Sequence, residues 1–458
     1  MNSGKKRYVQ VGLGARSEMY SQALVETYAD TCELVGLCDS NPGRLQDRQA
    51  WAAQRGRKVP AFSADQFDRM LVETRPDAVI VTTIDCYHDD YICRAMDAGC
   101  DVITEKPMTT DEMKCRRILE TQKKTGRSCR VAFNYRYSPP RTQVKDLLLS
   151  GVIGRVLSVD FHWMLDTFHG ADYFRRWHSY KKYSGGLMVH KATHHFDLVN
   201  WWLSTVPQTV FAVGQRCFYL PATAQAFGWS GAGARCLDCP DSERCAFHLD
   251  LRSLQGLKNL YLANEKYDGY IRDRCVFRSD IEIEDTVAAT VTYQNGAQMS
   301  YSLNAFAAWE GYQVVFNGTL GRLEHKCEEQ VYVSGDGTIP GALKTEGTWI
   351  KVFPLFAPAY EAKLWVAEGG HGGADPIMLA DILNPDPGRD LYLRAADQRA
   401  GAYSILCGVA ANRSMLSGRP VDIASLVADL QAPDYPQAKE RSPSSVYSRP
   451  DRKTWLFS

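Results

Sequence analysis

The sequence has no excess of either charge sign and no long apolar run. Lys plus Arg number 53 and Asp plus Glu number 53, so the formal net charge is zero and the pI is about 7.1. A neutral chain has no global field to hold a polyanion, so we expect no nucleic-acid partner. No segment reaches the roughly 18 consecutive apolar residues that a membrane helix needs, so we expect no membrane partner either.

We expect neither a secretory signal nor an internal repeat. Residues 1–8 lead directly into a strand-like segment without an apolar h-region. The fourteen cysteines are mostly scattered singly in apolar surroundings, where reduced thiols pack as small hydrophobic side chains. We therefore expect a cytoplasmic protein. Its 458 residues, 45% hydrophobic and 23% charged, suit a folded chain of two or three domains.

Strands alternate with helices over about the first 135 residues. This alternation is typical of a parallel sheet that is wound in both directions and covered by helices on both faces. We therefore predict an α/β fold whose first domain spans residues 1–137. The predicted strands are 7–12, 33–38, 78–82, 101–104 and 130–133, and the predicted helices are 46–54, 91–98 and 111–125.

The pattern changes after residue 137. Longer alternating runs at 156–163, 286–293 and 298–304 predict strands with one covered and one open face. We predict a second, α+β domain over residues 138–458, built on a large, mainly antiparallel open sheet. A polar, Cys-rich insertion at about 220–275 interrupts it, and a helical stretch is predicted at 391–416.

A glycine-rich turn follows the first strand and opens a helix. Gly12 permits the tight turn, and Gly14 lets the backbone approach a pyrophosphate. The N–H groups that open the helix, from Ala15 onward, offer hydrogen bonds to such an anion. Ser17 stands where the dinucleotide-binding pattern has its third glycine, so the match is partial.

An acidic residue strengthens this interpretation. Asp39 ends the second strand, where a carboxylate can accept hydrogen bonds from the adenosine ribose. Turn and acid together predict a Rossmann dinucleotide-binding domain with NAD as cofactor. Arg16 and Arg44 lie near enough in sequence to offset the charge of Asp39, so NADP stays open.

A polar segment ends another strand of the same sheet. Thr82, Thr83 and His88 fall at the edge where ligands bind to parallel sheets, and we interpret them as a loop along the nicotinamide side of the cofactor. A polar N-cap of the next helix is the alternative interpretation.

The residues Thr104-Glu105-Lys106-Pro107 resemble the signature of the Gfo/Idh/MocA oxidoreductase family. Asn134-Tyr135-Arg136 and Gly151-Val-Ile-Gly-Arg-Val follow in the family's order, so the resemblance covers most of the chain. It implies that Lys106 lies between nicotinamide and substrate, as a ligand of the substrate hydroxyl or a proton carrier. It also implies that Glu105 and Asn134 lie on the cofactor side.

The histidine-rich stretch 185–197 supplies the second part of the predicted site. The family pattern places an Asp, a His four residues later and an Asp three further on; His194 and Asp197 match, and His190 stands at the first position. An imidazole that titrates near neutral pH suits removal of a hydroxyl proton. We therefore predict His194 as general base, assisted by Lys106, with His190, Lys191 and Thr193 on neighbouring hydroxyls.

Two other interpretations of this stretch are open. His190 and His194 are four residues apart and could bind a metal together with His371 and Asp375, although the Glu of zinc hydrolases is missing. Alternatively, these side chains could simply pack between the domains. We expect five further residues to line the same cleft: Tyr135, Arg136, Trp177, His178 and His371.

The insertion carries a cysteine cluster. Cys236, Cys239 and Cys245 have Cys-x2-Cys-x5-Cys spacing, and Cys275 follows thirty residues later. Four thiolates can close a structural zinc site, which would stabilise a polar loop with little core of its own. We predict such a zinc site, with an iron–sulfur cluster or unliganded thiols as alternatives.

Three functions are compatible with these features. The first is an NAD(P)-dependent oxidoreductase that acts on a hydroxyl or keto carbon of a sugar or polyol. The second is a glycosidase or lyase that retains NAD and oxidises a sugar hydroxyl transiently, for which His190 and His195 would be useful extra bases. The third is a non-catalytic sugar or nucleotide sensor, against which Lys106 and His194 argue. The family resemblance also implies a homo-oligomer, a dimer or tetramer formed through the open sheet.

Overall fold

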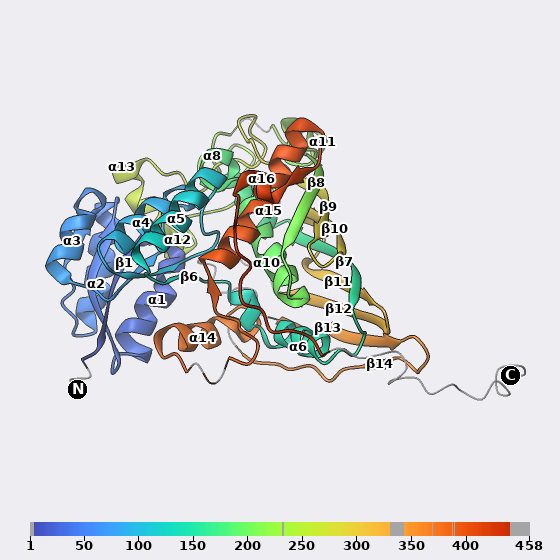
Figure 1. Ribbon diagram of the computed structural model, residues 1–458. Helices are drawn as coiled ribbons and strands as arrows, with labels where there is room; N and C mark the ends of the chain where they lie inside the picture. The colour runs from blue at the N-terminus through green and yellow to red at the C-terminus, as the bar shows by residue number, and fades with distance from the viewer. Residues whose placement is uncertain are drawn as a thin grey trace, which may run out of the picture.

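Two β-sheets organise the computed structural model, one mainly parallel and one mainly antiparallel (Figure 1). The structure describes residues 4–439 apart from 231–232, 330–342, 369, 387 and 389. The predicted fold class, a doubly wound domain followed by an α+β domain with an open sheet, is confirmed. Within the described ranges, no helix is both long and apolar enough to cross a membrane.

The first sheet has the strand order β15-β6-β5-β4-β1-β2-β3. Its central strands are short apolar runs buried on both faces, such as the Ala-Val-Ile-Val of β4, as parallel sheets covered by helices require. The strands are β1 (Lys6–Val11), β2 (Cys32–Asp39), β3 (Ala61–Ser63), β4 (Ala78–Val81), β5 (Asp101–Thr104), β6 (Cys129–Val131) and β15 (Ala396–Asp397); the helices are α1 (Glu18–Gln22), α2 (Pro42–Gln54), α3 (Phe67–Thr74), α4 (His88–Asp97) and α5 (Glu112–Thr125).

The edge strand β15 comes from late in the chain and pairs antiparallel with β6. The helix predicted at 391–416 therefore begins only at Gln398, as α15 (Gln398–Ser417). Asp397 caps it, because its carboxylate accepts hydrogen bonds from the backbone N–H groups of Arg399 and Ala400. Local pattern could not reveal that the residues before this cap join a distant sheet.

The second sheet has the order β14-β13-β12-β11-β7-β10-β9-β8-β16. Burial alternates along its strands, since one face packs on helices such as α10 (Ala192–Leu203) and α15 and the other is open (Figure 1). Its strands are β7 (Val156–Asp166), β8 (Pro207–Gln215), β9 (Thr286–Tyr293), β10 (Gln298–Ala307), β11 (Glu310–Gly318), β12 (Gly321–Glu329), β13 (Leu343–Pro354), β14 (Tyr360–Glu361) and β16 (Val421–Asp422); its helices include α6 (Pro139–Leu149), α9 (Leu187–His190), α10 (Ala192–Leu203) and α14 (Gly370–Leu383).

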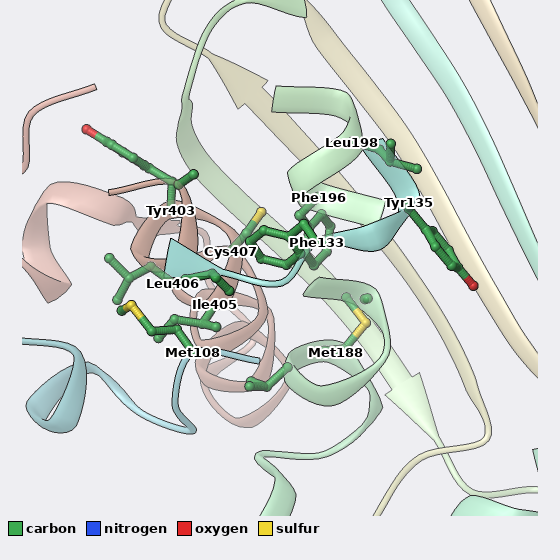
Figure 2. Close-up of a cluster of buried hydrophobic side chains, with 14 of the residues drawn as sticks. Met108, Phe133, Tyr135, Met188, Phe196, Leu198, Tyr403, Ile405, Leu406 and Cys407 are labelled. Atoms are coloured by element: carbon green, nitrogen blue, oxygen red, sulfur yellow. The ribbon is translucent and has the colours of Figure 1, made fainter. Parts of the chain in front are cut away.

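A continuous hydrophobic core joins the two sheets. Figure 2 shows side chains from both parts of the chain in one cluster, among them Met108, Phe133, Met188 and Phe196. Helix α15 runs through this core and approaches α9 closely, because a Cβ atom at Gly408 would lie 2.2 Å from the carbonyl oxygen of Met188. This packing fixes the histidine-rich segment α9–α10 relative to the first sheet.

The Cys-rich insertion lies against the first sheet's helices. It contains α11 (Pro221–Ala226), α12 (Gln255–Leu260), a single turn at Leu262–Asn264 and α13 (Glu265–Asp268). Asn41 Nδ2 donates to the carbonyl oxygen of Asn264 at 3.1 Å, and Asn264 Nδ2 donates to Asp47 Oδ2 at 3.2 Å. The insertion is therefore anchored at the start of α2.

Candidate active site

A cavity of about 770 Å³ lies between the carboxyl ends of the parallel strands and the second domain. This is a typical size for a small-molecule or cofactor site, and the strand ends of a doubly wound sheet are where such ligands bind. It brings together nearly all of the predicted catalytic, cofactor and substrate residues: Gly12, Gly14, Ala15, Arg16, Asp39, Arg44, Thr82, Thr83, His88, Glu105, Lys106, Asn134, Tyr135, Trp177, His178, His190, Lys191, His194 and His371.

The glycine-rich turn fits the diphosphate of a dinucleotide. Gly12 has a φ of +84°, and a Cβ atom there would lie 2.6 Å from the backbone nitrogen of Thr83, so only glycine permits this close approach. The carboxylate of Asp39 accepts a hydrogen bond from the backbone N–H of Leu13 at 2.6 Å. The acid that would bind a ribose is therefore held directly beside the turn.

The arginines near the turn are already paired. Arg44 donates to Asp39 Oδ1 at 3.0 Å and forms a second ion pair with Asp268 of the insertion at 2.9 Å. Arg16 donates to Glu105 at 2.7 Å and to Asp375 at 3.2 Å. Each guanidinium is thus shared by two carboxylates, whose combined negative charge exceeds its own positive charge.

Lys106 lies at the centre of the site. It follows β5, and its Nζ donates to the backbone oxygen of His190 at 3.5 Å. Burial lowers the pKa of Lys106 to about 8, although the carboxylates of Asp85 and Glu105 act in the opposite direction. The ammonium can therefore donate a proton near neutral pH more readily than an ordinary lysine.

Asp85 and His190 form a buried pair beside this lysine. Asp85 Oδ2 and His190 Nδ1 are 2.5 Å apart. Burial raises the pKa of Asp85 well above its ordinary value and lowers the pKa of His190 well below its own. The pair is thus favoured as a neutral unit that shares one proton.

His194 faces the same cavity from α10. Its ring stacks on Tyr135, with centroids 4.1 Å apart, and among the described residues its Nδ1 meets no hydrogen-bond partner. Burial lowers the pKa of His194 well below 6.5, so the imidazole is neutral and able to accept a proton at pH 7. Lys191 Nζ donates to the hydroxyl of Tyr135 at 3.1 Å and so helps to fix the position of this ring.

Asp375 joins three of the predicted residues. It accepts hydrogen bonds from Asn134 Nδ2 at 2.8 Å and from Arg16, and its Oδ2 lies 2.8 Å from His371 Nδ1. His371 itself has a φ of +53°, inside the kinked start of α14. The glycines around His371 therefore allow a turn that brings its ring to the cavity.

Three predicted residues do not line the cavity. Ser17 Oγ donates to the carbonyl oxygen of Gly14 at 2.6 Å and stabilises the turn from behind. Thr193 Oγ1 donates to Ser404 at 3.0 Å within the core. Arg136 forms a buried two-point ion pair with Asp197, at 2.8 and 2.6 Å. The structure gives all three a packing role, because α10 turns Thr193 and Asp197 away from the cleft.

Two further residues are engaged with the protein itself. The ring nitrogens of His88 lie 2.9 and 3.1 Å from the carbonyl oxygens of Pro107 and Thr83, so His88 braces the loops that carry Lys106 and Thr83. His195 Nδ1 lies 2.7 Å from the Tyr301 hydroxyl in the core of the second domain. His195 is therefore not available as an extra base.

The structure does not support the predicted metal sites. In the described part of the chain, no group of three or more His, Cys, Asp or Glu residues is placed to hold a metal ion. Cys236 Sγ instead accepts a hydrogen bond from Arg175 Nη1 at 3.1 Å. His190 and His194 belong to separate helices, α9 and α10, and His190 turns to Asp85. Neither the zinc cluster nor a catalytic metal on these histidines is supported.

Sequence reasoning missed several residues of the cavity. Asp85 falls in the segment identified as a cofactor loop, but its partner lies 105 residues away, and no local signal links the two. Arg176 is adjacent to the predicted Trp177 and carried no motif. Tyr261 and Tyr270 belong to the insertion, which only the fold brings to the turn.

Family comparisons agree with this architecture. Residues 6–133 match the model described as "Oxidoreductase family, NAD-binding Rossmann fold", and residues 145–423 match "Oxidoreductase family, C-terminal alpha/beta domain". The Bacillus subtilis protein YteT, named as an oxidoreductase, is 39% identical over 430 residues, covering 92% of this chain and 98% of YteT.

More distant relatives match smaller parts. The Escherichia coli D-glucoside 3-dehydrogenase is 30% identical over 156 residues, covering 34% of this chain and 42% of that protein. Among solved structures, the WlbA dehydrogenase from Bordetella pertussis, in complex with NADH and UDP-GlcNAcA, aligns with a TM-score of 0.61 at 19% identity. It covers 92% of this chain and 99% of its own, and at that identity the likeness shows the fold.

Proposed function

This chain belongs to the Gfo/Idh/MocA oxidoreductase family, and we propose that it transfers hydride between NAD and a hydroxyl or keto carbon of a sugar or polyol. The observation that carries this proposal is the half-buried Lys106, placed in one cavity with the glycine-rich turn, Asp39 and His194. Relatives named as glucoside and inositol dehydrogenases support a carbohydrate substrate.

The bound nicotinamide would accept or supply the hydride. Lys106 holds the substrate oxygen and stabilises the negative charge that develops on it. His194, neutral at pH 7, accepts the hydroxyl proton in the oxidative direction and returns it in the reductive direction. The Asp85–His190 pair binds a neighbouring hydroxyl and offers a second proton carrier beside Lys106.

The cofactor preference follows from charge. Asp39 lies beside the turn and pairs with Arg44, but the same guanidinium also pairs with Asp268, so one positive charge is shared by two carboxylates. A 2′-phosphate would meet the Asp39 carboxylate at close range. We therefore propose NAD over NADP.

A glycosidase or lyase that keeps NAD tightly bound is the second candidate. Besides His194, the neutral imidazoles of the cavity include those of His178 and His190, and a simple alcohol oxidation needs only one base. Such bases could remove the proton next to a transiently oxidised carbon, after which a leaving group departs. A relative from Akkermansia muciniphila named as a glycosyl hydrolase family 109 protein is 29% identical over 33% of this chain and 32% of its own.

One experiment separates the two candidates. Extensively dialysed protein is denatured, and any nucleotide released is identified and quantified per chain by mass spectrometry. Sugars and polyols are then screened for NADH absorbance, and glycosides for release of aglycone. Stoichiometric NADH formation supports the dehydrogenase, and aglycone release with retained NAD and no net NADH supports the glycosidase. A protein that does neither and binds no dinucleotide contradicts both.

Two further features complete the proposal. All fourteen cysteines are free thiols, which is consistent with work in a reducing cytoplasm. The open face of the second sheet is the surface through which we propose a homo-oligomer. Size-exclusion chromatography with light scattering tests the oligomeric state directly.

A further inference from the structure

We propose that Arg176, Tyr261 and Tyr270 form a second wall of the dinucleotide site and bind the cofactor's diphosphate from the side opposite the glycine-rich turn. The Cys-rich insertion thereby serves as a cofactor clamp. This inference rests on the proposed function, which supplies the dinucleotide. It adds residues that lie outside the Rossmann domain and that the glycine-rich turn alone does not predict.

The insertion reaches the turn itself. The backbone N–H of Ala15 donates to the Tyr261 hydroxyl at 3.3 Å, and a Cβ atom at Gly14 would lie 3.8 Å from the same hydroxyl. The N–H groups at this turn are the ones a diphosphate would use. A phenol at this place can donate its own hydrogen bond to a phosphate oxygen bound there.

The position of Tyr261 is fixed by the contacts around it. Asn264, three residues on, exchanges hydrogen bonds with Asn41 and Asp47 of the first domain. Asp268 pairs with Arg44 at 2.9 Å. The insertion is thus attached to the first domain on the adenosine side of the turn, and Tyr261 is held over the cavity.

Behind the tyrosines lies an excess of positive charge. Arg176 Nη1 donates to Asp172 Oδ2 at 3.2 Å, and Arg272 Nη2 lies 2.6 Å from Asp172 Oδ1, so two guanidiniums share one carboxylate. Arg272 is fully buried, and its Nε and Nη1 meet no hydrogen-bond partner within the described ranges. The same holds for Arg176 Nε, whereas Arg176 itself lines the cavity.

Asp85, the other carboxylate near Arg176, does not balance the positive charge of Arg176 and Arg272. Asp85 acts electrostatically on the same region, but it is paired with His190 and favoured in its neutral form. A buried cationic excess beside a cavity is strongly stabilised by an anion that accepts hydrogen bonds from it. The ligand chemistry required is therefore a phosphate or a carboxylate.

Position favours the cofactor's diphosphate over an anionic substrate. Tyr261 and Tyr270 have ring centroids 5.7 Å apart, and the Arg272 guanidinium lies 5.8 Å from the Tyr261 ring. Tyr270 interacts with both Arg176 and Arg272. The tyrosines and guanidiniums thus form one continuous patch that ends at Ala15, on the turn.

The test measures binding of NAD⁺, ADP and adenosine by calorimetry, and NADH dissociation by stopped-flow fluorescence, on full-length protein. Arg176→Gln should raise the Kd for NAD⁺ and ADP about tenfold or more and change that for adenosine less than about twofold, because only the first two carry a diphosphate. Tyr261→Phe keeps the ring and should speed NADH dissociation about threefold. Tyr261→Phe perturbs the fold less than Arg176→Gln does. If Arg176→Gln is unstable, the proposal is therefore tested with Tyr261→Phe.

Matched controls come from the same insertion. Arg252→Gln and Tyr267→Phe alter side chains that are 62% and 44% exposed and lie outside the cavity, and both should bind like the wild type. If the wild type binds NAD⁺ and ADP, and both test variants show the same Kd values and the same NADH dissociation rate, the clamp proposal is overturned. The proposed function is then unaffected. If Arg176→Gln changes only the KM of a uronic acid substrate, Arg176 binds the substrate and not the diphosphate. This result also overturns the clamp proposal. A wild type that binds no dinucleotide overturns the proposed function as well.

Discussion

Asp85 Oδ2 and His190 Nδ1 lie 2.5 Å apart across the cleft between the two domains. Asp85 lies in the segment between β4 and α4, and His190 ends α9, so the pair connects the cofactor domain to the histidine-rich segment. His190 also contacts Lys106 through its backbone oxygen. The carboxylate therefore orients the imidazole beside the lysine that we propose to hold the substrate oxygen.

Replacing Asp85 by Asn should lower kcat by about 10- to 100-fold, because an amide cannot release or take up the proton that the Asp85 carboxyl shares with His190. NAD⁺ binding should change little. Steady-state kinetics and calorimetry measure the two effects separately. Asp89→Asn on the same segment, where the carboxylate pairs with Arg117 outside the cavity, is the matched control. Equal activity of Asp85→Asn and wild type would contradict the proposed role of the pair.

Lys106→Met should abolish most activity, by about 1,000-fold, with the Kd for NAD⁺ unchanged within about threefold. The same substitution should stabilise the protein at pH 7, because the folded state then no longer buries an ammonium whose pKa falls from 10.5 to about 8. The gain in the free energy of unfolding is at most about 3 kcal/mol. It is smaller in practice because Lys106 is partly exposed and solvent screens its charge.

The sign of this stability effect can be checked with pH. Below pH 8 the wild-type lysine is protonated in both folded and unfolded states, so the burial cost is fully present. As pH rises from 8 toward 10.5, the folded state loses its proton first and the advantage of Lys106→Met disappears. Thermal unfolding of the wild type and of Lys106→Met at pH 7 and pH 10 measures this difference in stability. Loss of NAD⁺ binding together with loss of folding would contradict a catalytic role for Lys106.

The pH dependence of kcat/KM should show a falling limb near pH 8. Charged Lys106 stabilises the developing alkoxide, and this contribution is lost as the ammonium deprotonates. Lys106→Arg should lower the rate and remove this limb, because a guanidinium stays charged to higher pH. A limb that persists unchanged in the arginine variant would assign it to another group.

Asp39→Asn should shift preference toward NADP. The substitution removes the charge that repels a 2′-phosphate and releases Arg44 from one of its two carboxylates. The ratio of the NADP⁺ to the NAD⁺ dissociation constant should fall by about tenfold or more. Asp30→Asn, on an exposed loop of the same domain and outside the cavity, should leave the ratio unchanged. An unaltered ratio in Asp39→Asn would remove the basis for preferring NAD.

Arg136→Met should destabilise the protein by about 3 to 5 kcal/mol without raising the KM of a substrate. The Arg136 and Asp197 side chains are both 1% exposed, so removal of the guanidinium leaves a buried carboxylate without its partner. Chemical denaturation measures the loss. A specific rise in KM with unchanged stability would restore the substrate role predicted from the sequence.

Several parts of the site could be predicted because local sequence encodes them. The turn at Gly12 needs a residue without a Cβ atom, and Asp39 marks the end of the next strand. The resemblance around Lys106 placed the lysine at a strand end, where the structure has it. Each of these signals lies within one strand and the turn that follows it.

Other parts could not be predicted from local pattern. The cysteine spacing suggested zinc, but Cys236 contacts Arg175, a residue 61 positions earlier. Helical spacing put His190 and His194 on one face, but the helix breaks between them and each ring finds a different partner. Partners far apart in sequence leave no periodic signal.

The sequence by itself determined the doubly wound first domain, the open second sheet and the nucleotide turn, because hydrophobic periodicity and glycine geometry act over a few residues. The central lysine was predicted from the resemblance of residues 104–107 to the family signature. Only the tertiary structure decided that Asp85 pairs with His190, that Arg136 is buried against Asp197, and that Tyr261 reaches the turn from the insertion. Those contacts join residues 61 to 246 positions apart, and packing of the two sheets and the insertion brings them together.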